Sequence, residues 1–225
     1  MAKHILRQMD RLRERIAAVA SKAEAAFLRA VKATIERDAA LARAVIDGDE
    51  EIDAIEVDVE EECLKLLALY QPVALDLRFI VSVLKINNDL ERVGDLAVNI
   101  AERAAFLAEE EHPGIAIDFE GMARLTSGML AQSIEALLGE DTDRARRVIA
   151  GDDEVDRLNR EIYEQIKARM RREPAEVDRL IHCLAIARHL ERIADHATNI
   201  AEDVIYMVDG EIMRHKPEDY RTVRP

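Results

Sequence analysis

The sequence predicts an all-α fold of two tandem, internally duplicated three-helix bundles, with six long antiparallel helices. Hydrophobic residues make up 49% of the 225 positions but aromatic residues only 4%, so the apolar surface is mostly Ala, Leu, Ile and Val, as in helical bundles. Five prolines and eight glycines interrupt a sequence that otherwise favours helices. One polar pattern also occurs twice, about 100 positions apart. Together these observations indicate a duplicated helical bundle.

Glycine and proline set the limits of the helices in the first half. The first helix is expected to end at Asp47-Gly48, and the second to stop before Pro72, which cannot continue it. Acidic residues from Asp49 onward favour a helix start, because they lie at the positive end of the helix dipole. The third helix runs on to His112-Pro113-Gly114. The expected helices span residues 3–46, 49–70 and 73–110.

The same signals divide the second half. Its first helix is expected to end before Gly151, its second to begin with acidic residues at Asp152 and stop before Pro174, and its third to follow. The expected helices span residues 117–149, 152–171 and 175–213. Because three amphipathic helices can close one core, we expect one bundle in residues 1–112 and another in residues 113–225.

The two halves match in order as well as in kind. The segment VIDGDEEID from Val45 corresponds to VIAGDDEVD from Val148, and LERVGDLAVNIAE from Leu90 corresponds to LERIADHATNIAE from Leu190. The offset is 103 residues for the first pair and 100 for the second, so the second half is about one helical turn shorter near Pro174. The chain therefore contains an internal duplication.

Acidic residues on the second and third helices of the first half are expected to face each other. With about 100° per residue, Glu91 and Asp95 lie on one side of their helix. Antiparallel helices joined by a short turn bring residues at equal distances from that turn level with each other. Asp49 lies as far before Pro72 as Asp95 lies after it, and Asp53 pairs with Glu91 in the same way.

The second half repeats this arrangement around Glu173-Pro174. Each half should therefore gather four carboxylates at one level across two neighbouring helices. The candidate metal ligands are Asp49, Asp53, Glu91 and Asp95 in the first half, and Asp152, Asp156, Glu191 and Asp195 in the second.

Carboxylates held this close repel one another, since even an exposed like-charged pair at i, i+4 costs roughly 0.2 to 0.5 kcal/mol. A multivalent cation would offset the repulsion, and oxygen ligands suit Mg, Mn, Ca or Fe. Two other interpretations are open. The acids that begin helices, such as Asp49 and Asp152, could cap them, and Arg92 and Arg192 could form salt bridges with their neighbours. Duplication of all four positions favours metal ligands.

These motifs resemble those of the PhoU family of regulators of phosphate uptake. The E(D)xxxD pattern occurs four times, as DEEID, ERVGD, DDEVD and ERIAD, and the segment NIAE occurs twice, over nearly the whole chain. The resemblance implies two similar three-helix bundles whose motif carboxylates bind metal, with iron or zinc as the expected ions and Mg or Mn as alternatives. Asn159 and Thr198 replace Glu56 and Val98 at the edge of the second site, so the two sites need not be equivalent.

The same resemblance implies regulation rather than catalysis. It predicts a cytoplasmic negative regulator that links the ATPase of the phosphate ABC transporter to a sensor histidine kinase and also restrains the transporter. The protein is expected to be a homodimer.

Charge and cysteine content restrict the remaining possibilities. A net charge of -14 and a pI near 5.0 argue against a nucleic-acid-binding protein. Cys63 and Cys183 do not occupy matching positions in the repeats, so no disulfide is expected and a reducing cytoplasm fits. The uncharged runs are too short to span a bilayer, so any contact with a membrane should be peripheral.

Two other functions are compatible with a duplicated acidic bundle. A carboxylate-bridged di-metal enzyme needs Glu-x-x-His pairs inside the bundle, and the one such spacing, Glu109 to His112, lies at a helix end. His182, His189 and His196 follow one another at intervals of seven and are expected to be ordinary helix residues. A metal-free acidic adaptor would instead use the carboxylates to contact basic partners. The repeated motifs favour the metal-binding regulator over both.

Overall fold

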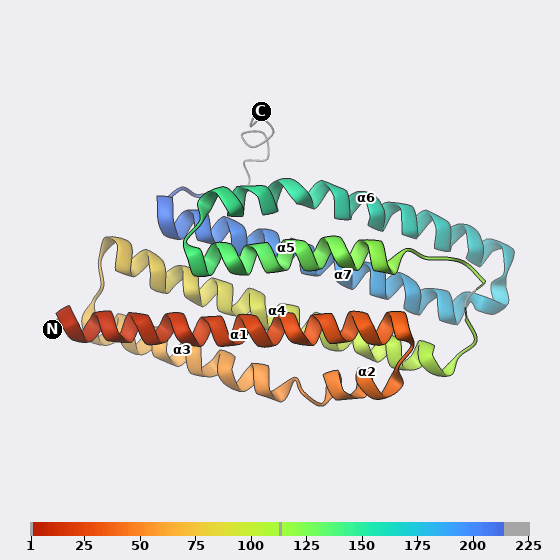
Figure 1. Cartoon of the computed structure of the whole chain (residues 1–225), viewed down its shortest axis with the longest axis horizontal. Coiled ribbons are helices and arrows are strands. Elements are labelled where there is room, and N and C mark those ends of the chain that lie inside the picture. Colours follow the sequence, from red (N-terminus) through yellow and green to blue (C-terminus); the bar gives the residue numbers. More distant parts are fainter. Residues whose placement is uncertain (1, 113, 214–225) are drawn as a thin grey trace.

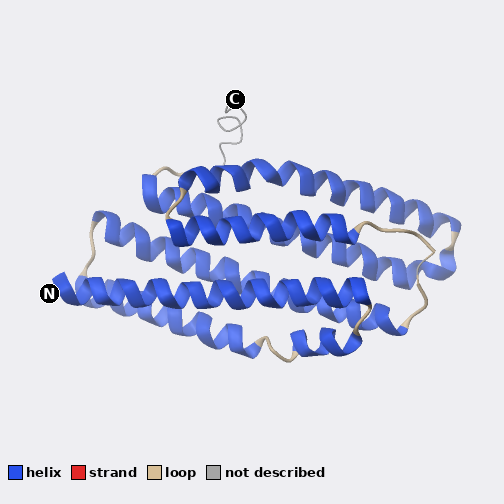
Figure 2. Ribbon diagram, viewed as in Figure 1, coloured by secondary structure: helices blue, strands red, loops and turns tan. Residues whose placement is uncertain are grey.

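The computed structural model describes residues 2–112 and 114–213, and these residues form helices and loops without any strand (Figures 1 and 2). Six helices in these ranges are long and two are short. They are α1 (Ala2–Glu36), α2 (Ala39–Ile46), α3 (Glu50–Tyr70), α4 (Ala74–Glu109), α5 (Phe119–Gly139), α6 (Thr142–Arg172), the short 3-10 helix η1 (Pro174–Glu176) and α7 (Val177–Asp209). The predicted all-α fold is confirmed.

Helices α4 and α7 lie side by side in the middle of the molecule (Figure 1). Within the first repeat α4 packs against α1, α2 and α3, and within the second α7 packs against α5 and α6. Because α4 also packs along α7 and α1 contacts α5, the two three-helix units share one continuous apolar core. The division of the chain at residues 112 and 113 stays a prediction, and Pro113 and residues 214–225 lie outside the described residues.

The long first helix expected in each repeat is interrupted, so the predictions of unbroken helices over 3–46 and 117–149 were wrong. The chain breaks at Arg37-Asp38 and at Glu140-Asp141, two positions with the same offset of 103 as the matching motifs. Arg37 and Glu140 adopt left-handed backbone conformations, with φ of 54° and 51°. Each is followed by an aspartate that caps the next helix.

The predicted break at Gly151 was also wrong, because α6 continues through it. A single glycine inside a helix costs only about 1 kcal/mol relative to alanine. Val148 and Val155 lie two turns apart on the same buried side of α6, and their packing holds the helix together across Gly151. In the first repeat the equivalent segment does break, at residues 47–49 between α2 and α3.

Within residues 2–112 and 114–213, no helix combines the length and the apolarity that crossing a membrane requires.

Candidate metal centres

The first candidate centre lies where α3 begins and α4 passes its midpoint. α4 buries Leu90, Val93 and Ala97 in the core, at the spacings of three and four that place residues on one helix face. This orientation leaves Glu91 and Asp95 on the side of α4, half-buried rather than in the core.

Gly94 lets α3 and α4 approach closely at this level. A Cβ atom at Gly94 would lie 3.2 Å from Ile52 Cδ1 and 3.7 Å from Asp49 Oδ1. The Asp49 carboxylate therefore lies against the backbone of α4 at Gly94, one residue before Asp95. This is the register that the sequence predicted around Pro72.

The charges of the first centre act on one another. Burial raises the pKa of the Asp49 carboxyl, and Asp53 and Asp95 raise it further. Burial also raises the pKa of Glu91, with additional increases from Asp95 and Asp53 that Arg92 partly offsets. The four predicted carboxylates of the first repeat are thus brought into one electrostatic cluster.

The second centre shows the same coupling between α6 and α7. Burial, Asp195 and Asp156 raise the pKa of the Asp152 carboxyl to about 6. Burial followed by Asp156 raises the pKa of Glu191, and burial followed by Glu191 raises that of Asp195. The interacting pairs, Asp152 with Asp195 and Asp156 with Glu191, are those expected from the turn at Pro174.

The structure gives no support to capping as the role of these acids. Asp49 precedes α3 but makes no side-chain hydrogen bond to the first turn. Asp152 lies well inside α6, whose actual N-terminal cap is Asp141. Capping therefore explains neither position, although both begin an acidic run.

Salt bridges are shorter in the first centre than in the second. In the first, Arg92 Nη1 lies 2.9 Å from Asp95 Oδ2, and Arg92 Nε lies 3.5 Å from Glu91 Oε2. In the second, Arg192 forms no ion pair within 4.0 Å among the described residues, and Arg160 lies 3.9 Å from Asp156. The arginines of the second cluster thus make longer contacts, but Arg188 and Arg192 still lower the pKa of Glu191.

The chemistry of both clusters fits a cation, since their ligands are carboxylate oxygens whose negative charges destabilise one another. The side chains themselves, however, are not arranged as closely as metal binding requires. Among the described residues no group of three or more His, Cys, Asp or Glu side chains is close enough together to hold a metal ion. Convergence on one ion would require side-chain rotation, which the exposed Asp53 and Asp195 can undergo.

A polar contact that was not predicted joins the repeats beside these centres. The buried Asp89 of α4 accepts a hydrogen bond from Asn199 Nδ2 at 3.3 Å and lies 2.8 Å from His196 Nδ1, both on α7. His196 thus contacts the other repeat instead of a carboxylate cluster. In the sequence, Asp89 and His196 occupy positions that are not equivalent in the two repeats. Their contact could be predicted only if the packing of α4 on α7 were known.

Three further polar residues make contacts within one helix or between α4 and α7, or are buried. Asn99 Nδ2 donates to the carbonyl oxygen of Asp95 in its own helix, at 2.8 Å. The ring of His182 stacks on Phe106 with centroids 3.9 Å apart, and burial lowers the pKa of His182. Burial likewise lowers the pKa of His189, to about 4, so these two imidazoles are neutral near pH 7.

Comparison with known proteins gives matches over most of the chain. A protein of Aquifex aeolicus described as "Phosphate-specific transport system accessory protein PhoU homolog" is 40% identical over 214 residues, which cover 94% of this chain and 96% of the relative. The crystal structure of PhoU from Pseudomonas aeruginosa superposes with a TM-score of 0.88 at 35% identity, covering 91% of this chain and 98% of that one.

A second solved structure, the phosphate transport system regulatory protein PhoU from Streptococcus pneumoniae, has a TM-score of 0.81 at 25% identity and covers 92% of this chain and 98% of its own. The PhoU domain model matches twice, at residues 16–104 and 119–204, in agreement with the internal duplication. The chain therefore belongs to the PhoU family.

Proposed function

We propose that this protein is a non-enzymatic, cytoplasmic regulator of phosphate uptake and phosphate-starvation signalling, and that its two carboxylate clusters bind metal ions. Family membership supports the regulatory part, because relatives that are 40% and 38% identical are described as accessory proteins of the phosphate-specific transport system. The repeated carboxylate clusters support the metal-binding part.

The mechanism is binding. Asp49, Asp53, Glu91 and Asp95 would hold one ion or cluster, and Asp152, Asp156, Glu191 and Asp195 the other. Bound iron, zinc or another divalent cation would supply positive charge that offsets the repulsion within each cluster. The carboxylates lie on both members of each packed helix pair, α3 with α4 and α6 with α7, so ligation would fix the relative positions of these helices.

The partners in this proposal are the ATPase of a phosphate ABC transporter and a sensor histidine kinase. As a negative regulator, the protein would contact both and keep starvation genes repressed while phosphate is abundant. Acidic outer helices suit contacts with basic protein surfaces, since complementary charge favours correctly oriented encounters. A homodimer is part of the proposal.

The observation that carries the metal-binding proposal is that both repeats place acids at equivalent positions on two packed helices, where they raise one another's pKa values. It is tested by elemental analysis of purified protein beside a variant with four central ligands changed to alanine. That variant carries Glu91→Ala, Asp95→Ala, Glu191→Ala and Asp195→Ala. We expect bound metal in the wild type and at least a tenfold smaller metal content in the variant.

A control variant removes the same number of negative charges from exposed positions outside the clusters. It carries Glu14→Ala, Glu110→Ala, Glu120→Ala and Asp178→Ala. This variant should retain the metal content of the wild type. Equal metal in the wild type and the ligand variant, or equal loss in both variants, would refute specific binding at the predicted positions.

The regulatory role is tested by deleting the gene and measuring phosphate-starvation transcripts in phosphate-rich medium. We expect these transcripts to be expressed constitutively and to be repressed again by the wild-type gene. Repression that persists in the deletion strain would contradict the regulatory role. The ligand variant, supplied in place of the wild type, then shows whether repression depends on the carboxylates.

A further inference from the structure

A groove on the outer surface of the second repeat lies between α6 and α7, beside the second carboxylate cluster. It encloses about 380 Å³. Its lining consists of Asn159, Arg160, Tyr163, Glu164, Leu184 and Arg188. Two arginines, one from each helix, therefore border the same small space, and an aromatic ring and a leucine form part of its wall.

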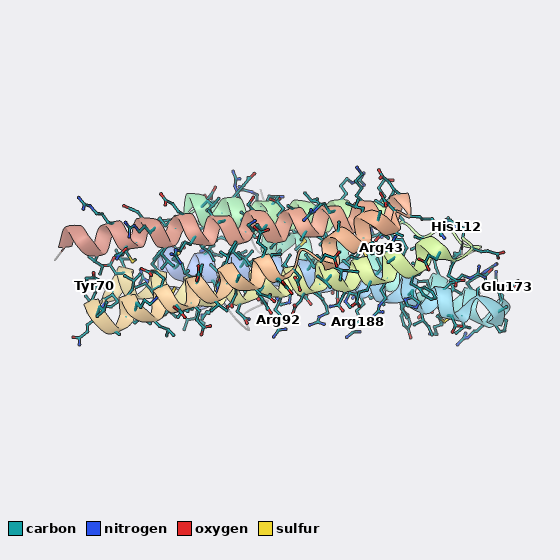
Figure 3. All side chains as sticks on the ribbon, turned by 90° about the horizontal axis from the view of Figure 1, so that it is seen from below. Arg43, Tyr70, Arg92, His112, Glu173 and Arg188 are labelled. Atoms are coloured by element: carbon teal, nitrogen blue, oxygen red, sulfur yellow. The ribbon has the colours of Figure 1, made fainter. Side chains whose placement is uncertain are left out.

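Both guanidinium groups have hydrogen-bonding capacity to spare. Arg188 is exposed and makes no ion pair or hydrogen bond with any other residue in the described part of the chain, and Figure 3 shows its side chain extending outward. The Arg160 side chain is 72% exposed, and its one ion pair, to Asp156, is long at 3.9 Å. Neither arginine is committed to a strong internal contact.

The one carboxylate in the lining is balanced by a lysine. Lys167 Nζ lies 3.1 Å from Glu164 Oε1 and 5.4 Å from the centre of the Tyr163 ring. The groove thus has two arginines in excess over its own paired acid. Asp156 and Glu191 of the neighbouring cluster also act on Arg160 and Arg188, so the positive charge is confined to the lining of the groove. A concave site with polar donors converging from two helices can accommodate an anionic group.

The duplication provides an internal comparison. With the offsets that relate the two repeats, Arg160 corresponds to Val57 and Arg188 to Asn88, while Asn159 and Tyr163 correspond to Glu56 and Glu60. The equivalent surface between α3 and α4 is therefore acidic and has no arginine at these positions. If the fold required these arginines, they would occur in both repeats. The arginine pair therefore reflects a property of the second repeat alone.

We propose that this groove binds the phosphate group of a small molecule. Arg160 and Arg188 would donate hydrogen bonds to the phosphate oxygens, because the planar guanidinium fork matches phosphate geometry. The Asn159 side chain offers a further donor, and Tyr163 and Leu184 form an apolar wall for an organic substituent. The site uses no metal and does not depend on metal binding at the carboxylate clusters.

The proposal is tested by isothermal titration calorimetry on the full-length protein after removal of metal with EDTA and dialysis. The titrants are inorganic phosphate, AMP, adenosine and succinate. We expect saturable binding of phosphate or AMP and none of adenosine. AMP binding more tightly than phosphate would identify an organic phosphate as the ligand, whereas equal affinity would identify inorganic phosphate.

Two matched variants locate the site. Arg160→Gln with Arg188→Gln should weaken phosphate or AMP binding by about tenfold or more, since hydrogen bonds between charged groups contribute strongly. Arg147→Gln with Arg157→Gln removes the same charge from exposed positions of α6 outside the groove and should leave binding unchanged. Both variants should retain the circular dichroism spectrum of the wild type.

Absence of phosphate and AMP binding would overturn the proposal. So would binding that the groove variant retains, an equal loss in the two variants, or succinate binding as tightly as phosphate. Because the protein is free of metal in this experiment, these outcomes are separate from success or failure of the metal-binding proposal.

Discussion

At the scale of single residues, Asp152 has a destabilising charge. Its pKa is raised from 3.8 to about 6 by burial and by Asp195 and Asp156, so the folded state binds a proton more tightly than the unfolded state does. This group therefore lowers the stability of the metal-free protein as the pH rises from about 4 to about 6, and the loss is complete above pH 6.

We expect Asp152→Asn to stabilise the metal-free protein at pH 7.5 by about 1 kcal/mol, a value reduced from the full shift to allow for solvent screening. The gain should shrink as the pH falls and vanish well below pH 3.8, where the carboxyl is protonated in both states. Urea unfolding with EDTA at the two pH values measures this gain, with Glu154→Gln as control, because Glu154 is exposed and does not contribute to the raised pKa of Asp152. A variant that is no more stable than the wild type at pH 7.5 would contradict this account.

A second prediction at the residue scale concerns the buried Asp89. Replacing it with alanine leaves His196 and Asn199 without their shared acceptor between α4 and α7. Such a loss costs about 1 to 3 kcal/mol. Adding His196→Leu, which introduces the residue type found at the equivalent Leu96, should recover part of that loss. Urea unfolding of the four proteins of the cycle measures the coupling, and strictly additive effects would argue against a direct interaction.

At the scale of helices, the breaks before α2 and α6 depend on aspartate caps. Asp38 Oδ1 accepts hydrogen bonds from the backbone N–H groups of Ala40 and Leu41, each at 2.9 Å, and Asp141 Oδ1 accepts one from Arg144 at 2.9 Å. We expect Asp38→Ala and Asp141→Ala each to lower the free energy of unfolding by about 1 kcal/mol, within the usual range for caps. Denaturant unfolding is the measurement, and the exposed mid-helix variant Asp10→Ala should change stability by much less.

These breaks show what the sequence could and could not predict. The six long helices, their order and the level of the carboxylate pairs follow from proline positions and from periodicity, because both depend on local chemistry and on the short turns at Pro72 and Pro174. The breaks at Arg37 and Glu140 do not, since neither residue is the glycine that a positive φ favours. Gly151 gave a false break because tertiary packing outweighed its weak helix propensity.

The contacts of the candidate sites were likewise only partly predictable from the sequence. Pairs within one repeat, such as Asp152 with Asp195, could be placed from the sequence because a single short turn sets their register. The contact of Asp89 with His196 lies between repeats, and no local turn determines that register. The groove at Arg160 and Arg188 was likewise missed, because charge on a helix is usually only solvated until a neighbouring helix turns it into a concave site.

At the scale of the whole molecule, the helices that carry the carboxylates are also the helices that join the repeats. α4 bears the half-buried Glu91 and Asp95, and α7 bears the half-buried Glu191 and the exposed Asp195. The two helices pack against each other (Figure 1). A change in the packing of α3 on α4, or of α6 on α7, therefore has a direct structural path to the seam between the two halves. Metal binding at either cluster would therefore affect the packing between both repeats.

The shared core leads to a prediction about the two halves as separate chains. Residues Val31 and Ile100 of the first repeat meet Ile186 and Leu190 of the second at the seam, and the last three are almost completely buried. Separation would expose such side chains, each of which contributes about 1.5 to 3 kcal/mol when fully buried. We expect residues 1–112 expressed alone to aggregate or to lack a cooperative unfolding transition, and the full chain to unfold in a single transition.

Circular dichroism with urea, together with size-exclusion chromatography, tests this expectation. Mixing the 1–112 and 113–225 chains should restore helicity and a soluble heterodimer, since each supplies the apolar surface that the other lacks. A monomeric 1–112 fragment with full helicity and its own cooperative transition would instead show that the repeats are independent folding units. In that case the packing of α4 on α7 would be a docking contact between two finished domains rather than part of a common core.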